Sequence, residues 1–161
     1  MTEKQAVLRI ASYCSKAERC EYDVRRKLVA WEIEKEIADR IVSYLKKENF
    51  LSEDRFCQSF IKDKLRFNKW GKNKIIFELR KKHVSESLIN TSFEILSIDD
   101  EFEEPLIKLL QTKIKSVKAA NDYEKRMKLI RFAVGRGFSI ELAQKCLNKL
   151  MSNRDDEEYF S

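Results

Sequence analysis

The sequence predicts an all-α protein made of three tandem three-helix repeats that stack into an elongated, curved array. Helix breakers are scarce, with three Gly and one Pro among 161 residues, whereas Lys, Glu, Leu, Ile and Arg, which favour helices, are abundant. Apolar residues recur at helical spacing from Val7 onward, and no long stretch alternates in the manner of a strand. The apolar pattern also repeats along the chain, which indicates tandem units.

Nine helices are expected from this spacing. Ser52, Ser85 and Ser139 each precede a periodic segment, where a side-chain oxygen can accept hydrogen bonds from the free amides of a helix start. Asn121 with Glu124 three residues later resembles a capping box. The expected helices span residues 2–14, 18–31 and 34–48, then 52–67, 71–82 and 85–97, and finally 101–117, 122–135 and 139–151.

The internal repeat appears when the chain is shifted along itself by 51 and then by 54 residues. Six columns are then apolar in all three copies: Val24, Ile75 and Leu129; Leu28, Leu79 and Ala133; Ile33, Val84 and Phe138; Ile37, Leu88 and Leu142; Val42, Phe93 and Leu147; Leu45, Leu96 and Leu150. The predicted organisation is repeat 1 (1–49), a basic central repeat 2 (50–98), repeat 3 (99–152) and an acidic tail (153–161) that is expected to fray. A trio of about 50 residues has a small core, so neighbours are expected to share one.

An acidic run, Asp99–Glu104, stands before Pro105 at the seam between repeats 2 and 3. Proline belongs in the first turn of a helix, and carboxylates there oppose the positive end of the helix dipole. We therefore interpret the run as the charged start of a solvated helix. An acidic docking site is the alternative.

The charge balance points to acidic partners. The chain carries a formal net charge of +6 and has a pI of about 9.1, which attracts nucleic acid, an anionic membrane surface or an acidic protein. No apolar run reaches the roughly 18 residues of a membrane-spanning helix. Charges also interrupt the first eleven residues, so no signal peptide is expected.

The residues that usually carry catalysis or bind metals form no recognisable pattern. The four cysteines form no close pair and His83 is the single histidine, so reduced thiols are expected rather than disulfides or a zinc site. No nucleophile stands with a base, no glycine loop could cradle a phosphate, and no carboxylate pair has assignable acid and base roles. We do not expect an enzyme.

Positive charge is concentrated in repeat 2. From Asp54 to Val84 the chain has ten basic residues and three acidic ones, a local charge of +7. Surfaces that are merely solvated usually mix the two signs, so we predict a polyanion-binding patch here. Its predicted contact residues are Lys62, Arg66, Lys69, Lys72, Lys74, Phe77, Arg80, Lys81 and Lys82.

Two aromatic residues lie among these charges. On a helical wheel Ile75, Ile76 and Leu79 form the buried stripe together with His83, which is expected to be packed. Phe77 points nearly the opposite way. An exposed aromatic ring among cations suits a binding surface, although a neighbouring helix could cover Phe77 instead. Trp70 is expected to pack as a staple at the helix entry, with a contact role as the alternative.

Several segments resemble the RecX family of regulatory proteins. Residues 50–61 (FLSEDRFCQSFI) and 71–82 (GKNKIIFELRKK) are similar to the central signature of that family, and residues 123–142 (YEKRMKLIRFAVGRGFSIEL) to its C-terminal repeat. Residues 22–28 (YDVRRKL) match more loosely. A glycine that is usual after the second helix of each repeat is retained as Gly137, but Glu32 and His83 replace it in repeats 1 and 2. Asp23 stands where the family often has Glu.

The resemblance implies a cytoplasmic modulator of the recombinase RecA, acting in homologous recombination, DNA repair and the SOS response. It implies binding in the groove of the filament that RecA forms on single-stranded DNA, with inhibition of strand exchange, ATP hydrolysis and co-protease activity. No cofactor or membrane is implied, and a monomer is expected. Only the cationic positions of repeat 2 are carried over, as electrostatic contacts.

Two other functions remain open from the residues themselves. The second and third helices of each repeat resemble a helix-turn-helix pair, so the protein could bind DNA directly. A plain helical scaffold for an acidic protein is the weaker alternative.

Overall fold

The computed structural model describes the backbone of residues 1–160 and the side chains of residues 1–151. Within that part of the chain there are nine α-helices, one short 3₁₀ helix and no strand, so the predicted all-α class and the three helix trios are confirmed. The helices are α1 (Glu3–Lys16), α2 (Glu21–Ala30), α3 (Lys35–Lys47), α4 (Glu53–Arg66), α5 (Lys72–Lys81), α6 (Glu86–Leu96), η1 (Asp99–Phe102), α7 (Glu103–Ser116), α8 (Asp122–Gly135) and α9 (Ile140–Phe160). Helix α9 continues to Phe160, beyond its expected end at residue 151, while the predicted fraying of residues 153–161 stays a prediction.

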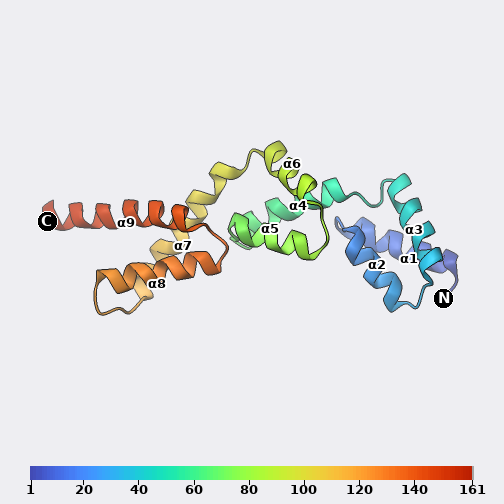
Figure 1. The fold of residues 1–161 in the computed structure, drawn as a ribbon, viewed down its shortest axis with the longest axis horizontal. Helices are drawn as coiled ribbons and strands as arrows, with labels where there is room; N and C mark the ends of the chain where they lie inside the picture. Colours follow the sequence, from blue (N-terminus) through green and yellow to red (C-terminus); the bar gives the residue numbers. More distant parts are fainter. Residues whose placement is uncertain (161) are drawn as a thin grey trace. The chain divides into compact units, whose positions relative to one another are not determined.

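The chain divides into two compact units whose boundaries fall inside helices. Unit 1 comprises residues 1–61 and 78–96, and unit 2 comprises residues 62–77 and 97–161, so α4 and α5 each contribute to both. Within unit 1, α1, α2 and α3 pack together, and they are blue to cyan in Figure 1. Within unit 2, α7, α8 and α9 pack together, in yellow to red.

The apolar columns found in the sequence form the cores. Unit 1 has a buried cluster that draws on each helix of the first trio and extends to Leu51. In both units all six repeated columns consist of buried or half-buried residues, which confirms the register of the repeat. Burying these side chains supplies the main driving force for folding, at about 1.5–3 kcal/mol for a fully buried large apolar side chain.

The turn after the second helix has the same backbone conformation in all three repeats. Glu32, His83 and Gly137 have φ angles of 60°, 61° and 95°. In each repeat the next residue donates its N–H to a carbonyl five residues back, which is the Schellman arrangement that ends a helix. These bonds run from Ile33 to Leu28 at 3.0 Å, from Val84 to Leu79 at 3.1 Å and from Phe138 to Ala133 at 3.1 Å. The loss of two family glycines therefore leaves the turn unchanged.

Because Glu32 is not a glycine, its left-handed backbone is strained. A left-handed conformation costs an L-residue roughly 1–2 kcal/mol, and glycine relieves that cost while gaining some entropy in the unfolded chain. We expect Glu32→Gly to raise the free energy of unfolding by about 0.5–1 kcal/mol, measured by urea denaturation. Glu36→Gly is the control. Glu36 lies inside α3, so this variant should lower the free energy of unfolding by about 1 kcal/mol. A destabilised Glu32→Gly variant would contradict the assignment of strain.

In unit 2, the start of α5 is held by the turn between α8 and α9. The N–H of Gly71 donates to the carbonyl of Arg136 at 2.8 Å, and the N–H of Asn73 donates to that of Gly137 at 2.9 Å. These bonds satisfy amides that have no partner within the helix. The backbones approach so closely that a Cβ on Gly71 would lie 2.2 Å from the carbonyl carbon of Gly137. Two glycines thus permit a contact that no larger residue would allow.

Candidate polyanion-binding surface

Helix α5 positions the exposed aromatic residue as the helical wheel predicts. Ile75 and Leu79 are fully buried on one side, while Phe77 is 58% exposed. Arg80 and Lys81 are exposed on the last turn. Of the two interpretations of Phe77, exposure at the surface is therefore correct and burial under a neighbouring helix is wrong.

The predicted contact residues divide between the two units. Six of them lie in unit 2: Lys62, Arg66, Lys69, Lys72, Lys74 and Phe77; the other three, Arg80, Lys81 and Lys82, lie in unit 1. Within unit 2 the side chains of Lys62, Lys72 and Lys74 are half-buried, whereas Arg66 and Lys69 are exposed. The structure thus gathers the residues as two groups, each attached to its own core.

Carboxylates from other segments neutralise part of this charge. In unit 2, Lys72 pairs with Asp99 at 2.9 Å and Arg66 with Glu101 at 3.5 Å. In unit 1, Arg80 pairs with Glu86 on α6, while Lys81 lies 3.6 Å from Glu78 of its own helix, an acid already counted in the local charge. The expectation that signs are not mixed around repeat 2 is therefore wrong, because a count along the chain cannot see acids that folding brings near.

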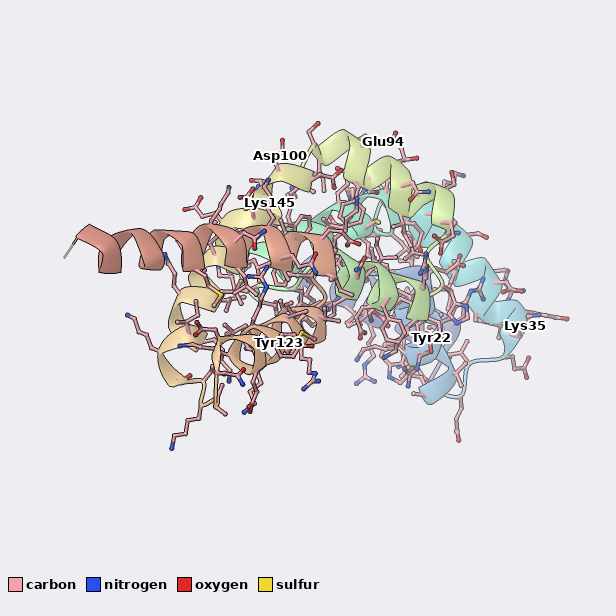
Figure 2. All side chains as sticks on the ribbon, turned by 60° about the vertical axis from the view of Figure 1, so that its left-hand side comes forward. Tyr22, Lys35, Glu94, Asp100, Tyr123 and Lys145 are labelled. Carbon is pink, nitrogen blue, oxygen red and sulfur yellow. The ribbon has the colours of Figure 1, made fainter. Side chains whose placement is uncertain are left out.

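The acidic run before Pro105 takes part in this neutralisation. Its residues form η1 and the first turn of α7, as the helix-start interpretation requires. Besides the two pairs above, Glu103 accepts hydrogen bonds from Lys145 at 3.1 Å and from Lys149, and these lysines hold the pKa of its carboxyl below the usual range. Lys145 is labelled in Figure 2. The run thus joins the helices of unit 2 to one another.

Lys82 and His83 in unit 1 bind the start of α2. Lys82 pairs with Asp23 at 2.8 Å, and the two side chains are 29% and 24% exposed. Burial alone would lower the pKa of Lys82, but its hydrogen bonds and attraction to Asp23 raise it above the usual value. The His83 ring stacks on Tyr22 with 4.7 Å between centroids. His83 is exposed in the left-handed turn, so its predicted packing on the apolar stripe is wrong, and Lys82 is engaged within the protein.

A second basic and aromatic group surrounds the loop between α4 and α5, and we call it the α4–α5 loop cluster. It consists of Lys64 at the end of α4, Phe67, Lys69 and Trp70 in the loop, and Lys74 in α5, all in unit 2. The ammonium groups of Lys64 and Lys74 lie 4.9 Å and 4.5 Å from the centroid of the Trp70 ring. Trp70 is half-buried, and its backbone N–H donates to the backbone carbonyl of Lys64 at 3.0 Å. Its side chain thus packs, as expected, and also holds two cations.

Phe67 is the surface residue that the sequence analysis missed. Its side chain is 80% exposed, more than that of any other large apolar residue with a described side chain. The internal repeat could have indicated this exposure. A shift of 51 residues matches Phe67 with Lys16, which is also exposed. A large aromatic residue in a solvated column has no role in the core.

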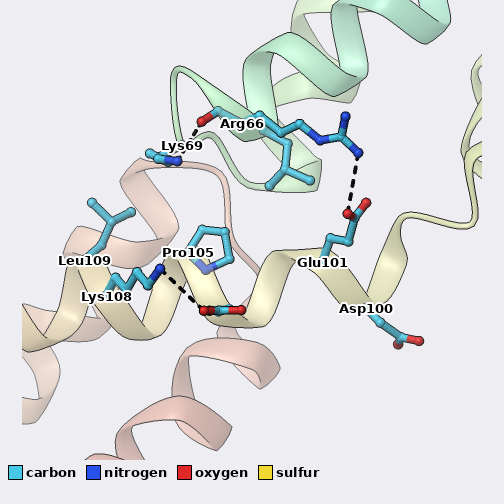
Figure 3. A pocket seen from close by; sticks show the side chains of 9 residues that line it. Arg66, Lys69, Asp100, Glu101, Pro105, Lys108 and Leu109 are labelled. Atoms are coloured by element: carbon cyan, nitrogen blue, oxygen red, sulfur yellow. Dashed lines mark hydrogen bonds and ion pairs between the residues drawn. The ribbon is translucent and has the colours of Figure 1, made fainter.

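A hollow of about 460 Å³ lies beside this cluster in unit 2. Figure 3 shows its apolar lining and a rim of charges with both signs, among which Arg66 pairs with Glu101 and Lys108 with Glu104. The lining residues are Leu65, Arg66, Lys69, Asp100, Glu101, Glu104, Pro105, Lys108 and Leu109. Four of its six charged residues thus neutralise one another in two ion pairs.

Metal ligands and reactive thiols do not gather in the described part of the chain. No group of three or more His, Cys, Asp or Glu side chains there could hold a metal ion. The cysteines are unpaired and buried, and burial raises the pKa of the Cys20 thiol to about 12, which keeps it protonated at neutral pH. Nor is any described helix long and apolar enough to cross a bilayer.

The fold and this surface define an all-helical tandem-repeat protein with exposed cations and aromatic rings. Residues 52–92 match the family model of the RecX second three-helix domain, and residues 99–147 match that of the RecX third three-helix domain. Regulatory protein RecX of Clostridium beijerinckii is 30% identical over 152 residues, which cover 92% of this chain and 68% of the relative. The chain belongs to the RecX family of regulatory proteins.

Other comparisons agree. Regulatory protein RecX of Clostridium perfringens strain 13 is 28% identical over 152 residues, covering 93% of this chain and 69% of the relative. A crystal structure of regulatory protein RecX superposes with a TM-score of 0.81 at 20% identity, covering 91% of this chain and 73% of that one. The crystal structure of RecX from Lactobacillus salivarius superposes with a TM-score of 0.80 at 18% identity, covering 92% of this chain and 96% of that one. At these identities the two structures establish the fold alone.

Proposed function

We propose that this protein binds the filament that RecA forms on single-stranded DNA and lowers its recombinase, ATPase and co-protease activities. Its membership of a family of regulatory proteins supports this role. The surface observation that carries the proposal is the exposure of an aromatic ring and of cations along the same sequence segment: Phe77 is exposed in unit 2, and Arg80 and Lys81 are exposed in unit 1.

The chemistry of these exposed residues suits a filament of protein and nucleic acid. Cations at an exposed surface attract phosphates and carboxylates through the solvent, while an aromatic ring adds contact area or stacking. Tandem helical repeats commonly use extended surfaces to bind long partners. We further propose that the three helix trios are the structural domains of the chain, that it acts as a monomer in the cytoplasm, and that it regulates without catalysis.

The test is the ATPase rate of RecA on single-stranded DNA with increasing amounts of this protein. We expect the rate to fall with the concentration of the wild-type chain, and to fall less with the double variant Lys74→Glu and Lys81→Glu. The control is Lys35→Glu with Lys47→Glu, which makes the same charge change at exposed positions of α3. An ATPase rate that stays constant up to saturating protein would refute the proposal. Equal inhibition by both double variants would show that Lys74 and Lys81 do not contribute to binding the filament.

A further inference from the structure

We infer that the α4–α5 loop cluster is a direct contact site for single-stranded nucleic acid, which binds phosphates through Lys69 and Lys74 and stacks a base on Phe67. The inference deepens the proposed function, since it rests on a nucleic-acid strand being part of the partner. It assigns that strand to unit 2, at the end of α4, the loop that follows and the first turn of α5.

The first argument is the charge of the segment. From Lys64 to Phe77 there are five basic residues and no acidic one. Two of the five pair with carboxylates of η1. No carboxylate with a described position lies within 4 Å of Lys69 or Lys74, so their charge remains available to an anion.

The second argument is preorganisation. Lys74 is held over the Trp70 ring, and Lys69 donates to the carbonyl of Arg66 at 2.6 Å (Figure 3). Lys69 also has a φ of 57°, which fixes the loop in a sharp turn. Long lysine side chains lose much rotamer freedom when they bind. Here part of that entropy is lost in folding, so less remains to be lost on binding a phosphate.

The third argument is the exposed ring. Phe67 lies two residues after Leu65, a buried residue of α4. Its backbone is therefore held close to the core, while its phenyl ring remains 80% exposed. An aromatic ring next to ammonium groups is the arrangement by which proteins bind single strands without reading their sequence. An acidic peptide would satisfy the lysines but offers no flat π-face for Phe67, so nucleic acid is the better match.

The experiment measures binding of a fluorescein-labelled oligothymidylate to the full chain without RecA. Loss of one base stack should weaken binding, so we expect Phe67→Ala to lower affinity about 5- to 150-fold. Tyr123→Ala is the control, because Tyr123 is 75% exposed but lies at the opposite end of α8 from the turn that contacts Gly71. Both substitutions lie at exposed positions, so neither should prevent folding.

Salt dependence tests the lysines separately. We expect the variant Lys69→Glu with Lys74→Glu to lower the slope of log affinity against log salt by about 1.4, since single strands contribute about 0.7 per phosphate contact. The charge-matched control, Lys35→Glu with Lys47→Glu, should keep the wild-type slope. Wild-type affinity of Phe67→Ala, or equal slopes for the two double variants, would overturn the inference. So would polyglutamate competing as well as oligothymidylate, because that would identify an acidic protein as the partner.

Tryptophan fluorescence gives a local readout. The chain has two tryptophans, so Trp31→Phe leaves Trp70 as the reporter within the cluster. We expect oligothymidylate to change its emission, whereas Trp70→Phe, which reports on Trp31 in unit 1, should show no change. Inhibition of the RecA ATPase without binding of the bare strand would overturn this inference and leave the proposed function standing. Binding of the bare strand without inhibition of the ATPase would refute the proposed function and leave this inference standing.

Discussion

Replacing Gly71 with alanine is expected to lower the free energy of unfolding of unit 2 by about 3–4 kcal/mol. The new Cβ would lie 2.2 Å from the carbonyl carbon of Gly137 and 2.3 Å from the amide nitrogen of Phe138. These are backbone atoms, so no side chain can rotate away to make room. The start of α5 must move, and the bonds to the carbonyls of Arg136 and Gly137 are then lost at roughly 1 kcal/mol each.

The reciprocal substitution, Gly137→Ala, should lower the free energy of unfolding by a similar amount, and for two reasons. A Cβ on Gly137 would lie 2.3 Å from that of Lys74, and its φ of 95° is one that other residues rarely adopt. Gly135→Ala is the matched control, because nothing lies within 4 Å of a Cβ there and alanine favours a helix by roughly 1 kcal/mol. We expect Gly135→Ala to stabilise slightly.

Urea denaturation followed by fluorescence can locate the damage. In Gly71→Ala, the Trp31→Phe background reports on Trp70 and should show an early transition, while the Trp70→Phe background reports on Trp31 in unit 1 and should change less. A wild-type midpoint for Gly71→Ala would contradict the close approach of the two backbones.

The second large effect concerns a pair of core residues in unit 2, Ala133 and Phe138. They occupy the columns filled by Leu28 and Ile33 in repeat 1, and by Leu79 and Val84 in repeat 2. The two positions are joined by the Schellman hydrogen bond, a motif in which their side chains usually touch. A small residue at the first position accompanies a large one at the second, which indicates that the two share one volume.

We therefore expect Phe138→Val to cost about 2–4 kcal/mol by leaving a cavity, and Ala133→Leu to cost about 1–3 kcal/mol by overpacking. The double variant, which copies the apolar pair of repeat 2, should cost at least about 1 kcal/mol less than the sum of the two. Thermal and urea denaturation of the four proteins give this coupling directly. As a control, Ala38→Leu in unit 1 should add to Phe138→Val without coupling, and additivity of the main pair would show that the volume is not shared.

The sequence was sufficient for the fold because the fold depends on one repeated pattern. Apolar side chains at helical spacing must be buried, and the same columns recur in all three trios, so helix positions follow from spacing and from helix-start residues such as Asn121 and Ser139. Both of these cap their helices, with Asn121 accepting from Glu124 at 2.8 Å and Ser139 from Leu142 at 3.1 Å. Such local signals predict most helix ends to within three residues.

The surface could be predicted less well because it depends on distant residues. The pairing of Lys72 with Asp99 and of Lys82 with Asp23 joins positions 27 and 59 apart in the chain, and no local pattern announces either contact. The left-handed turns at Glu32 and His83 could not be predicted from the local sequence for a related reason. Packing of the following apolar residue holds each turn in place even where the glycine that suits it is missing.

The seams between neighbouring repeats are built from equivalent segments but with different chemistry. Where α2 begins, a stacked pair of rings and a lysine–carboxylate pair occupy the space; where α5 begins, two peptide backbones touch through paired glycines. The modules are therefore not interchangeable. Duplicating or transplanting one trio would bring together mismatched ends, so this chain could not be lengthened by simple copying without redesign of each new joint.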